Sequence, residues 1–451
     1  MGKLKIFKKE LNYIEPSVLF NTFYKGKNSI WLDSSLHNKF GRYSIMAFDA
    51  DTIFKSTGEN IEIEYKDGKT NEKGNPILEL YKLFEENKAE NATQLPFGAG
   101  ALGYLSYDLA WQIEKLPNLA KKQIDIPDIY FCFYSWAFIY DHLENRLFLT
   151  YIDGKVDVDY IFSKLPDKKE FTPAKVYSSK LDSCFNKEEY VKLVKRIKDY
   201  IKEGDIYQAN LSNRYFCKIF SSPIEVYYRL RELNPAPFSA FLDFGDFHVL
   251  SSSPERFILT KDKYIETRPI KGTRKKGSNI TENECLKTEL LNSVKDRAEL
   301  LMIIDLERND LGKICKAGSV KVPQLYTVEE YATVNHLVST VTGNLCDDIG
   351  INEIIKAVFP GGSITGAPKI RAMEIIEELE MYKRNVYTGS IGYISYCGDM
   401  DMNIAIRTIV INKNMAFYNV GGGIIWDSVP EDEYYETLYK GQALYKTLGG
   451  E

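Results

Sequence analysis

A lysine within the segment PIKGT (269–273) could act as a nucleophile. Proline and glycine hold the chain tightly around Lys271, and an amine that is partly desolvated near other charges can lose its proton close to neutral pH. The alternative is a solvated lysine in a turn, because residues flanked by proline and glycine are typical of turns. The reaction that we assign to the chain depends on whether Lys271 is a nucleophile or a solvated turn residue.

Two pairs of acidic residues have the spacing of a single helix face. Asp296 and Glu299 are three residues apart in an expected helix, and Glu433 and Glu436 repeat this spacing near the C-terminus, with Lys440 four residues further on. Carboxylates on two such helices could hold a hard cation such as Mg²⁺, with water and a substrate oxygen completing its shell. Surface ion pairing is the alternative, since Glu436 and Lys440 form a suitable i,i+4 pair.

Three single residues could act on an anion or on a leaving group. Glu255 follows a strand and a proline, where burial could raise its pKa into the range of a general acid unless it pairs with Arg256. His336 lies in an apolar stretch, as a core residue or as a site residue. Arg407, expected inside a strand over NIAIRTIVI (403–411), needs an anionic partner if it is buried.

Two glycine-rich segments could bind anions through backbone N–H groups. GGSITGAPK (361–369) leads from a loop into a helix, and VGGGI (420–424) follows a strand. Neither matches a Walker A or Rossmann fingerprint, so tight turns are the alternative for both.

The expected helices place these residues. A helix over Lys187–Glu203 has a clear apolar stripe and ends before Gly204. A second helix begins at Ser222, with Pro223 in the first turn and Glu225 completing a capping box. Further helices are expected over 282–309, from about Pro368, and over 431–448.

The remaining elements are expected to be strands. Residues 1 to about 165 are rich in short β-type runs, and the aromatic stretch Ile129–Tyr140 is too short for a membrane helix, which favours a buried strand. Segment 156–186, polar and proline-bearing, is the candidate linker. Without βαβ alternation or internal repeats, the pattern predicts a mostly antiparallel α+β fold of two stacked sheets flanked by helices.

Composition excludes several classes of function. A net charge of −5 over 451 residues argues against nucleic-acid binding. Seven scattered cysteines without a Cys-x-x-Cys pair favour reduced thiols in a cytoplasmic protein, and the N-terminus lacks the apolar core of a signal peptide. We therefore expect a cytoplasmic protein that binds neither nucleic acid nor a membrane.

Ten segments between about 190 and 445 together resemble the chorismate-utilising enzymes. They occur in the order IYQANLS (206–212), SSPERF (252–257), RPIKGTR (268–274), AELLMIIDLERNDLG (298–312), HLVSTVTG (336–343), GGSITGAPKIRAMEII (361–376), YTGSIGY (387–393), IAIRT (404–408), YNVGGGI (418–424) and EYYETLYK (433–440).

The resemblance implies two large stacked antiparallel sheets with the active site between them. Residues 185–451 would form the chorismate-binding catalytic region and residues 1–165 a strand-rich region, both within one intertwined unit.

The resemblance also implies roles for residues. Glu299 and Glu436 resemble the Mg²⁺ ligands, with Asp296 and Glu433 beside them, and Glu255 resembles the acid that protonates the departing 4-hydroxyl group. Arg407 and Tyr387 resemble a clamp for the enolpyruvyl carboxylate, and Thr273, His336 and Thr365 resemble residues that line the ring. Backbone N–H groups near Gly421, Gly422 and Gly423 would meet the ring carboxylate, and Lys440 is a further implied substrate-binding residue.

Within the family, the lysine distinguishes two branches. Members that aminate chorismate at carbon 2 and release pyruvate generally carry alanine at the position of Lys271. The lysine form resembles the branch that makes 4-amino-4-deoxychorismate, for 4-aminobenzoate and folate synthesis, through a covalent Lys271 adduct. Gln208 stands where water-adding relatives place a lysine, which disfavours water addition. Carbon-2 amination and a non-catalytic chorismate- or tryptophan-binding protein remain the alternatives.

The resemblance also implies partners. The sequence contains no Gly-x-Cys-x-Gly elbow of a glutamine amidotransferase, so ammonia would come from a separate glutamine amidotransferase subunit or from free ammonium. Formation of 4-aminobenzoate would need a separate aminodeoxychorismate lyase.

Two further segments resemble a tryptophan pocket found in relatives. Its candidate residues are Asp33, Ser34, Ser35, Asn234, Pro235, Ala236, Pro237 and Phe238. The alternative is a pair of turns between sheets with no ligand.

Overall fold

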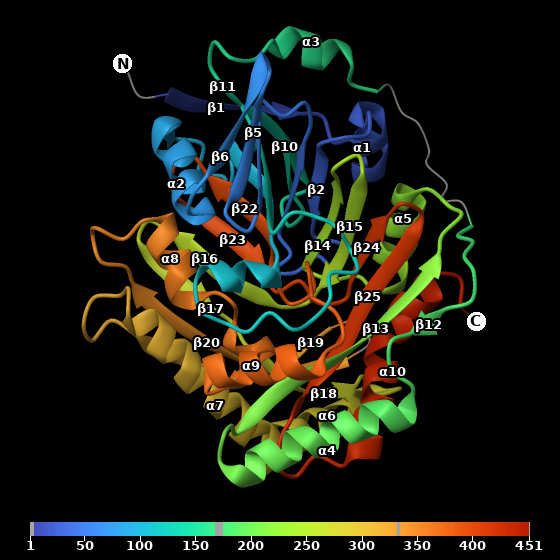
Figure 1. The fold of residues 1–451 in the computed structure, drawn as a ribbon. Helices are drawn as coiled ribbons and strands as arrows, with labels where there is room; N and C mark the ends of the chain where they lie inside the picture. The colour runs from blue at the N-terminus through green and yellow to red at the C-terminus, as the bar shows by residue number, and fades with distance from the viewer. Residues whose placement is uncertain (1–3, 167–174, 332–333, 451) are drawn as a thin grey trace.

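Two large β-sheets stack against each other, and helices cover their outer faces (Figure 1). The structure is a computed structural model and describes residues 4–166, 175–331 and 334–450. The α+β fold with two stacked, mainly antiparallel sheets is confirmed, and the candidate site lies among the C-terminal elements in the lower part of the view.

The first sheet has 13 strands in the described residues, all paired antiparallel except β1 with β7. Its spatial order is β12 (Asp182–Ser183), β13 (Gln208–Lys218), β25 (Met415–Ile424), β24 (Thr408–Asn412), β15 (Phe247–Ser253), β14 (Phe238–Asp243), β2 (Ser29–Asp33), β3 (Tyr43–Ala47), β10 (Trp136–Asp141), β11 (Arg146–Ile152), β1 (Leu4–Leu11) and β7 (Ala89–Asn91), with β21 (Gly366–Ala367) beside β13.

The second sheet has 12 strands among the same residues. Its order is β18 (Ile270–Lys275), β20 (Val334–Asn344), β17 (Tyr264–Thr267), β16 (Arg256–Lys261), β23 (Met400–Asn403), β22 (Ser390–Ser395), β8 (Gly100–Leu105), β9 (Ile129–Tyr134), β4 (Thr52–Thr57), β5 (Asn60–Tyr65) and β6 (Gly68–Lys73), with β19 (Lys321–Glu330) beside β20.

The helices divide between the two outer faces. The first sheet is covered by α1 (Pro16–Phe23), α5 (Pro223–Leu233) and α10 (Pro430–Thr447), and the second by α2 (Pro76–Glu86), α7 (Val294–Gly312) and α8 (Ile351–Val358). The others are α3 (Val158–Ser163), α4 (Lys187–Glu203), α6 (Ile280–Asn292) and α9 (Lys369–Leu379), with 3₁₀ turns η1 (Tyr107–Gln112) and η2 (Gly362–Ile364). None of the described helices is both long and apolar enough to cross a membrane.

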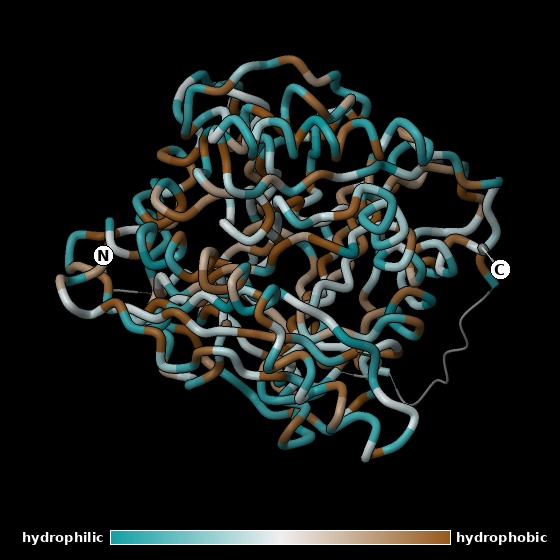
Figure 2. The backbone as a smooth tube through the Cα atoms, turned by 90° about the horizontal axis from the view of Figure 1, so that it is seen from below, coloured by the Kyte–Doolittle hydropathy of each residue, from teal (hydrophilic) through white to brown (hydrophobic). Residues whose placement is uncertain are grey.

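Most buried apolar side chains fill three layers, and a smaller fourth cluster packs α4 and α9 against β13 and β25. One cluster lies between the sheets and draws on both, for example Ile30 and Val249 from the first and Leu102 and Tyr130 from the second. The other two layers lie beneath the outer helices. Hydrophilic segments are prominent around the periphery in Figure 2, as burial of apolar surface requires.

The helix predicted over Lys187–Glu203 is confirmed with its boundaries. The Asn186 side chain accepts a hydrogen bond from Glu189 N (3.0 Å), the Glu189 carboxylate accepts one from Asn186 N (2.9 Å), and Gly204 ends the helix at a φ of +85°. At α5, the Glu225 carboxylate accepts a hydrogen bond from Ser222 N (2.9 Å). Capping by local side chains explains why the sequence locates these ends well.

Two expected strands are wrong because the chain passes from one sheet to the other within them. The run Ile129–Tyr140 forms β9 in one sheet and β10 in the other, on either side of Ser135. Arg407 does not lie inside a strand: the chain leaves β23, turns at Arg407 with a φ of +51°, and enters β24 of the opposite sheet. Residues before and after each passage between the sheets are buried. The apolar pattern therefore continues across the passage and does not mark where one strand ends and the next begins.

The helix expected over 282–309 is interrupted at Ser293. The Ser293 backbone is extended, with a φ of −66° and a ψ of +111°, and its side chain caps α7 by accepting a hydrogen bond from Asp296 N (3.2 Å). The expected linker 156–186 contains α3 and β12, and its residues 167–174 lie outside the described residues.

Candidate active site

Lys271 lies at a β-bulge in β18. The pairing of β18 with β20 shifts between Lys271 and Thr273, so Gly272 is an extra residue, and it has a φ of +76°. A side chain at Gly272 would be strained at this φ and would approach Asp296 Cγ to 2.9 Å. Because bulges redirect neighbouring side chains, this glycine explains how the segment PIKGT places Lys271.

The Lys271 amine lies among charged groups in a largely buried position. Its Nζ atom donates a hydrogen bond to the Ser363 carbonyl oxygen (3.0 Å). Burial lowers the pKa of Lys271, and the positive charge of Lys440 lowers it further, whereas Glu299 and Glu255 act in the opposite direction. Lys271 therefore lies in a strand and is partly buried, not in a solvated turn, and its lowered pKa makes the neutral amine more accessible.

Glu255 is buried, at 5% exposure, and is not paired with Arg256. Arg256 instead pairs with Asp401 (2.8 Å) and Glu266 (3.0 Å). Glu255 Oε1 accepts a hydrogen bond from Ser363 Oγ (2.7 Å), and burial raises the pKa of Glu255 to about 7. A carboxyl group with this pKa can hold a proton at neutral pH and donate it.

Gln208 and the glycines of β25 form the wall beside the lysine. The segment Gly421–Gly423 lies at the C-terminal end of β25, where a strand over MAFYNVGGG (415–423) is expected from the sequence, and it pairs with β13. A Cβ atom at Gly423 would come within 2.3 Å of Gln208 Nε2 and 3.4 Å of Lys271 Nζ. Gln208 is fully buried, yet neither polar atom of its amide has a hydrogen-bond partner in the described parts of the chain. Unpaired buried amide groups are costly, which indicates that a ligand or water completes this wall.

The first acidic pair lies on α7, near Lys271. Asp296 forms an ion pair with Arg274 (3.1 Å). Burial raises the pKa of Glu299, the positive charges of Lys271 and Lys295 lower it, and the negative charges of Asp296 and Glu436 raise it again. Such mutual repulsion marks a place where a cation would be stabilised.

The second acidic pair lies on α10 and faces Gly422. A Cβ atom at Gly422 would lie 3.3 Å from Glu433 Oε2, 3.5 Å from Glu436 Oε1 and 3.5 Å from Lys440 Nζ. Lys440 forms the expected ion pair with Glu436 (2.6 Å), which lowers the pKa of Glu436, and also donates to the Gly421 carbonyl oxygen (3.1 Å).

Two of these carboxylates could serve as ligands of a cation whose shell is completed by water and substrate oxygens. Within the described residues, no group of three carboxylate, imidazole or thiolate side chains converges to enclose an ion. Mg²⁺ needs only one or two carboxylates when water and substrate oxygens complete its shell. Glu299 and Glu436 come from two helices and their charges interact, so they are suitable ligands of that kind.

Arg407, Thr273 and His336 form another wall. Arg407 forms no ion pair within the described residues. Its Nη1 atom donates a hydrogen bond to Asn234 Oδ1 (3.4 Å), and burial lowers the pKa of Arg407. Thr273 Oγ1 lies 2.9 Å from His336 Nδ1, while His336 Nε2 has no partner in the same residues. Burial and the charge of Arg407 lower the pKa of His336 to about 3, so its imidazole is neutral. A guanidinium without a carboxylate partner can bind an anionic ligand.

Thr365 and Tyr387 are also buried, and Arg384 links their segments. Arg384 donates to the Ile364 carbonyl oxygen (3.1 Å), and its guanidinium lies 5.7 Å from the centre of the Tyr387 ring. Burial raises the pKa of Tyr387 to about 12, so its hydroxyl stays protonated. No hydrogen bond joins Tyr387 to Arg407 among the described residues, so their predicted joint role as a carboxylate clamp stays a prediction.

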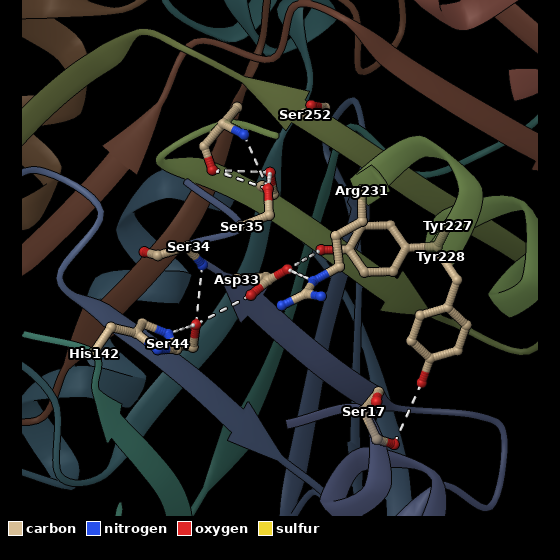
Figure 3. A network of polar contacts seen from close by, with 12 residues as sticks. Ser17, Asp33, Ser34, Ser35, Ser44, His142, Tyr227, Tyr228, Arg231 and Ser252 are labelled. Carbon is tan, nitrogen blue, oxygen red and sulfur yellow. Dashed lines mark hydrogen bonds and ion pairs between the residues drawn. The ribbon is translucent and has the colours of Figure 1, made fainter. Parts of the chain in front are cut away.

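The candidate tryptophan residues surround a separate cavity of about 210 Å³ between the sheets. Asp33, Ser34, Pro237 and Phe238 line it, whereas Ser35, Asn234, Pro235 and Ala236 do not. Figure 3 shows Asp33 bonded to Arg231 (2.6 Å), Tyr227 (3.0 Å) and Ser44 (3.1 Å) beside it. Asn234 instead bonds Ser252 (3.0 Å) and Arg407, which connects this segment with the candidate active site.

Sequence reasoning missed two residues that the structure brings into the site. Ser363 contacts both Glu255 and Lys271, and Asn210, beside Gln208, has a buried amide nitrogen without a partner in the described chain. Both lie within segments that carried the family resemblance, so the motifs located them. Their contacts depend on strands that are distant in sequence, which no local pattern reveals.

Comparisons with known proteins agree on one family. A model described as chorismate binding enzyme matches residues 36–446. The chain is 39% identical to "Aminodeoxychorismate synthase component 1" of Bacillus subtilis, over 94% of this chain and 92% of that protein. It is 34% identical to "Anthranilate synthase component 1" of Acetivibrio thermocellus, over 99% and 98%. The crystal structure of anthranilate synthase component I from Streptococcus pneumoniae matches with a TM-score of 0.79 and 31% identity, covering 90% of this chain and 93% of that one.

Proposed function

The chain belongs to the family of chorismate-binding enzymes, and we propose that it aminates chorismate to 4-amino-4-deoxychorismate, the activity for which its Bacillus subtilis relative is named. The observation that carries the proposal is the buried amine of Lys271, held beside the carboxyl group of Glu255 through Ser363. A neutral amine next to a protonated acid can add to a ring while a hydroxyl group departs.

The first step forms a bond from the Lys271 nitrogen to ring carbon 2. The two ring double bonds shift, the carbon 4–oxygen bond breaks, and the 4-hydroxyl takes the Glu255 proton and leaves as water. Ammonia then adds at carbon 4, the double bonds shift back, and the Lys271 amine departs from carbon 2. Two successive allylic displacements therefore place nitrogen at carbon 4. The new ammonium group then loses a proton, which can restore the acid form of Glu255. The lowered pKa of Lys271 and the raised pKa of Glu255 both support this assignment.

We propose Mg²⁺ as the cofactor, held by Glu299 and Glu436 with Asp296 and Glu433 beside them. When bound, the cation supplies a positive charge that neutralises the ring carboxylate of the substrate. Arg407, without a carboxylate partner in the described residues, would bind the enolpyruvyl carboxylate. Tyr387 would complete this carboxylate clamp, and Thr273, His336 and Thr365 would line the ring.

The ammonia is proposed to come from a glutamine amidotransferase that is a separate chain. The word "component" in the names of several relatives supports a partner subunit. A separate lyase would act on the product to give 4-aminobenzoate.

The 210 Å³ cavity is proposed to bind tryptophan. Phe40 and Phe238 offer aromatic faces to a ligand, while the charged lining residues Asp33 and Arg42 already pair with Arg231 and Asp141. Calorimetric titration of the purified protein with tryptophan tests this. Phenylalanine serves as the control, and absence of heat with tryptophan contradicts the proposal.

Carbon-2 amination is the competing function, because anthranilate synthase components are also similar to this chain. Purified protein incubated with chorismate, Mg²⁺ and ammonium at alkaline pH distinguishes the two. We expect 4-amino-4-deoxychorismate by mass spectrometry and no anthranilate fluorescence. Anthranilate formed without an added lyase contradicts the proposal, and a protein that binds chorismate and forms neither product is non-catalytic.

Replacing the lysine tests the covalent step. Lys271→Ala is expected to lose the carbon-4 product, because no amine remains to add at carbon 2, and ammonia adding there directly would give some carbon-2 product. Chromatography coupled to mass spectrometry measures both products. Unchanged carbon-4 amination in this variant rejects the covalent role of Lys271.

A further inference from the structure

Ser363 joins the two reacting side chains through two different atoms. Its hydroxyl donates to Glu255 Oε1 (2.7 Å), and its carbonyl oxygen accepts from Lys271 Nζ (3.0 Å). Ser363 is 7% exposed and lies in η2, whereas Glu255 precedes β16 and Lys271 lies on β18. One residue therefore holds groups from two separate segments.

The loop that carries Ser363 is anchored on several sides. Gly362 N donates to Glu307 Oε1 on α7 (3.0 Å), and Asn210 N on β13 donates to the Thr365 carbonyl oxygen (2.8 Å). Arg384 donates to the Ile364 carbonyl oxygen (3.1 Å). Contacts from α7, β13 and Arg384 thus restrain the loop on both sides of Ser363. They hold its contacts to Glu255 and Lys271 in place relative to each other.

The hydrogen bond from Ser363 also selects an oxygen of Glu255. Apart from Ser363, Oε1 accepts a longer bond from Ile270 N (3.4 Å). With Oε1 accepting from both Ser363 and Ile270, we infer that Oε1 is the carbonyl oxygen of the protonated carboxyl group and that Oε2 carries the acidic proton. The acid can then donate only from the oxygen that Ser363 does not contact.

We propose that Ser363 is a positioning residue that directs the acidic proton of Glu255 toward the leaving hydroxyl group and fixes this acid relative to the amine of Lys271. The inference rests on the proposed function, because it assigns Glu255 and Lys271 their chemical roles. The backbone carbonyl oxygen of Ser363 contacts the reacting amine of Lys271, whereas its side chain contacts only Glu255 and acts through that acid.

The test compares Ser363→Ala with Ser363→Thr in the full-length enzyme, with chorismate, Mg²⁺ and ammonium. The alanine variant keeps the backbone contact to Lys271 and loses only the hydroxyl, so kcat should fall about 10- to 100-fold, with KM for chorismate changed less than threefold. The threonine variant keeps a hydroxyl and should recover most of kcat. Ser395→Ala is the matched control. Ser395 lies in β22, and its buried hydroxyl group donates to the Ala99 carbonyl oxygen (3.2 Å), so removal of this hydroxyl should leave kcat unchanged.

Three outcomes overturn the inference: unchanged kcat in Ser363→Ala, an equal loss in Ser363→Thr, or a loss confined to KM. If Ser363→Ala does not fold, Ser363→Cys, which keeps a weak donor, should show an intermediate kcat, and a wild-type kcat in that variant also overturns it. Failure of the proposed function is seen separately. If wild-type enzyme releases anthranilate, carbon-4 amination is wrong, and the same kcat comparison still tests Ser363 because the 4-hydroxyl leaves in either reaction.

Discussion

At the scale of single residues, the site combines groups whose pKa values are displaced toward their reactive forms. Burial raises the pKa of Glu255 to about 7 and lowers that of Lys271. Each shift makes the neutral form more accessible, and the two groups meet at Ser363. Glu307, which anchors the same loop, also has its pKa raised to about 7 by burial. Tuning of this kind is characteristic of functional sites, although structural ion-pair networks can also produce it.

The shift of Glu255 predicts a pH dependence. Lys271 must be neutral and Glu255 must be protonated, so once Lys271 has lost its proton kcat should fall at alkaline pH, because the Glu255 carboxyl group, with its pKa at about 7, ionises. The profile is measured at constant free ammonia concentration, so that titration of ammonium does not contribute. Glu255→Gln should reduce kcat by about 10²- to 10⁴-fold and lack this alkaline decline. An identical decline in the variant would assign it to another group.

At the scale of elements, the sequence predicted the helices whose ends are capped by neighbouring residues. It failed where contacts between distant segments determine which sheet a strand joins. The ends of α4 follow from Asn186 and Gly204, which act on neighbouring residues. The chain passes from one sheet to the other at Arg407 because β23 and β24 pair with strands of different sheets. The apolar pattern is the same in both sheets, so it does not reveal this crossing. The motifs likewise supplied the residues of the site, but not the link through Ser363, which needs the folded loop.

The break at Ser293 has a functional consequence that can be tested. Ser293 caps the first turn of α7, which carries Asp296 and leads to Glu299. Ser293→Ala should cost about 1 kcal/mol of stability and weaken Mg²⁺ binding, because the turns that present the two carboxylates become less ordered. Thermal unfolding and titration calorimetry with Mg²⁺ in the presence of chorismate measure the two effects.

Asn279 provides the matched control for Ser293. Its side chain caps α6 by accepting a hydrogen bond from Glu282 N (2.9 Å), and α6 carries none of the proposed Mg²⁺ ligands. Asn279→Ala should therefore lower stability to a similar degree with unchanged Mg²⁺ affinity. Equal loss of Mg²⁺ affinity in both variants would show that the cap of α7 has no special relation to the metal.

At the scale of the whole molecule, each sheet is divided once between the two halves of the chain. In the first sheet, β14 pairs with β2, and in the second, β22 pairs with β8. All other neighbours in the described sheets come from the same half. The candidate tryptophan cavity lies along this division, lined by Leu32 and Tyr43 from one half and Phe238 and Ile391 from the other. A ligand there would contact both halves of the chain.

This topology predicts that the catalytic region cannot fold alone. A fragment of residues 185–451 would expose the edges of β14 and β22, where Phe241 and Leu242 are fully buried and Ile391 and Ile394 nearly so. Exposed apolar edge strands pair with other chains, so we expect the fragment to aggregate. The intact chain should unfold in one transition, with the same midpoint by circular dichroism and by tryptophan fluorescence. A soluble fragment that binds chorismate, or two separate transitions, would instead show that the two regions are independent domains.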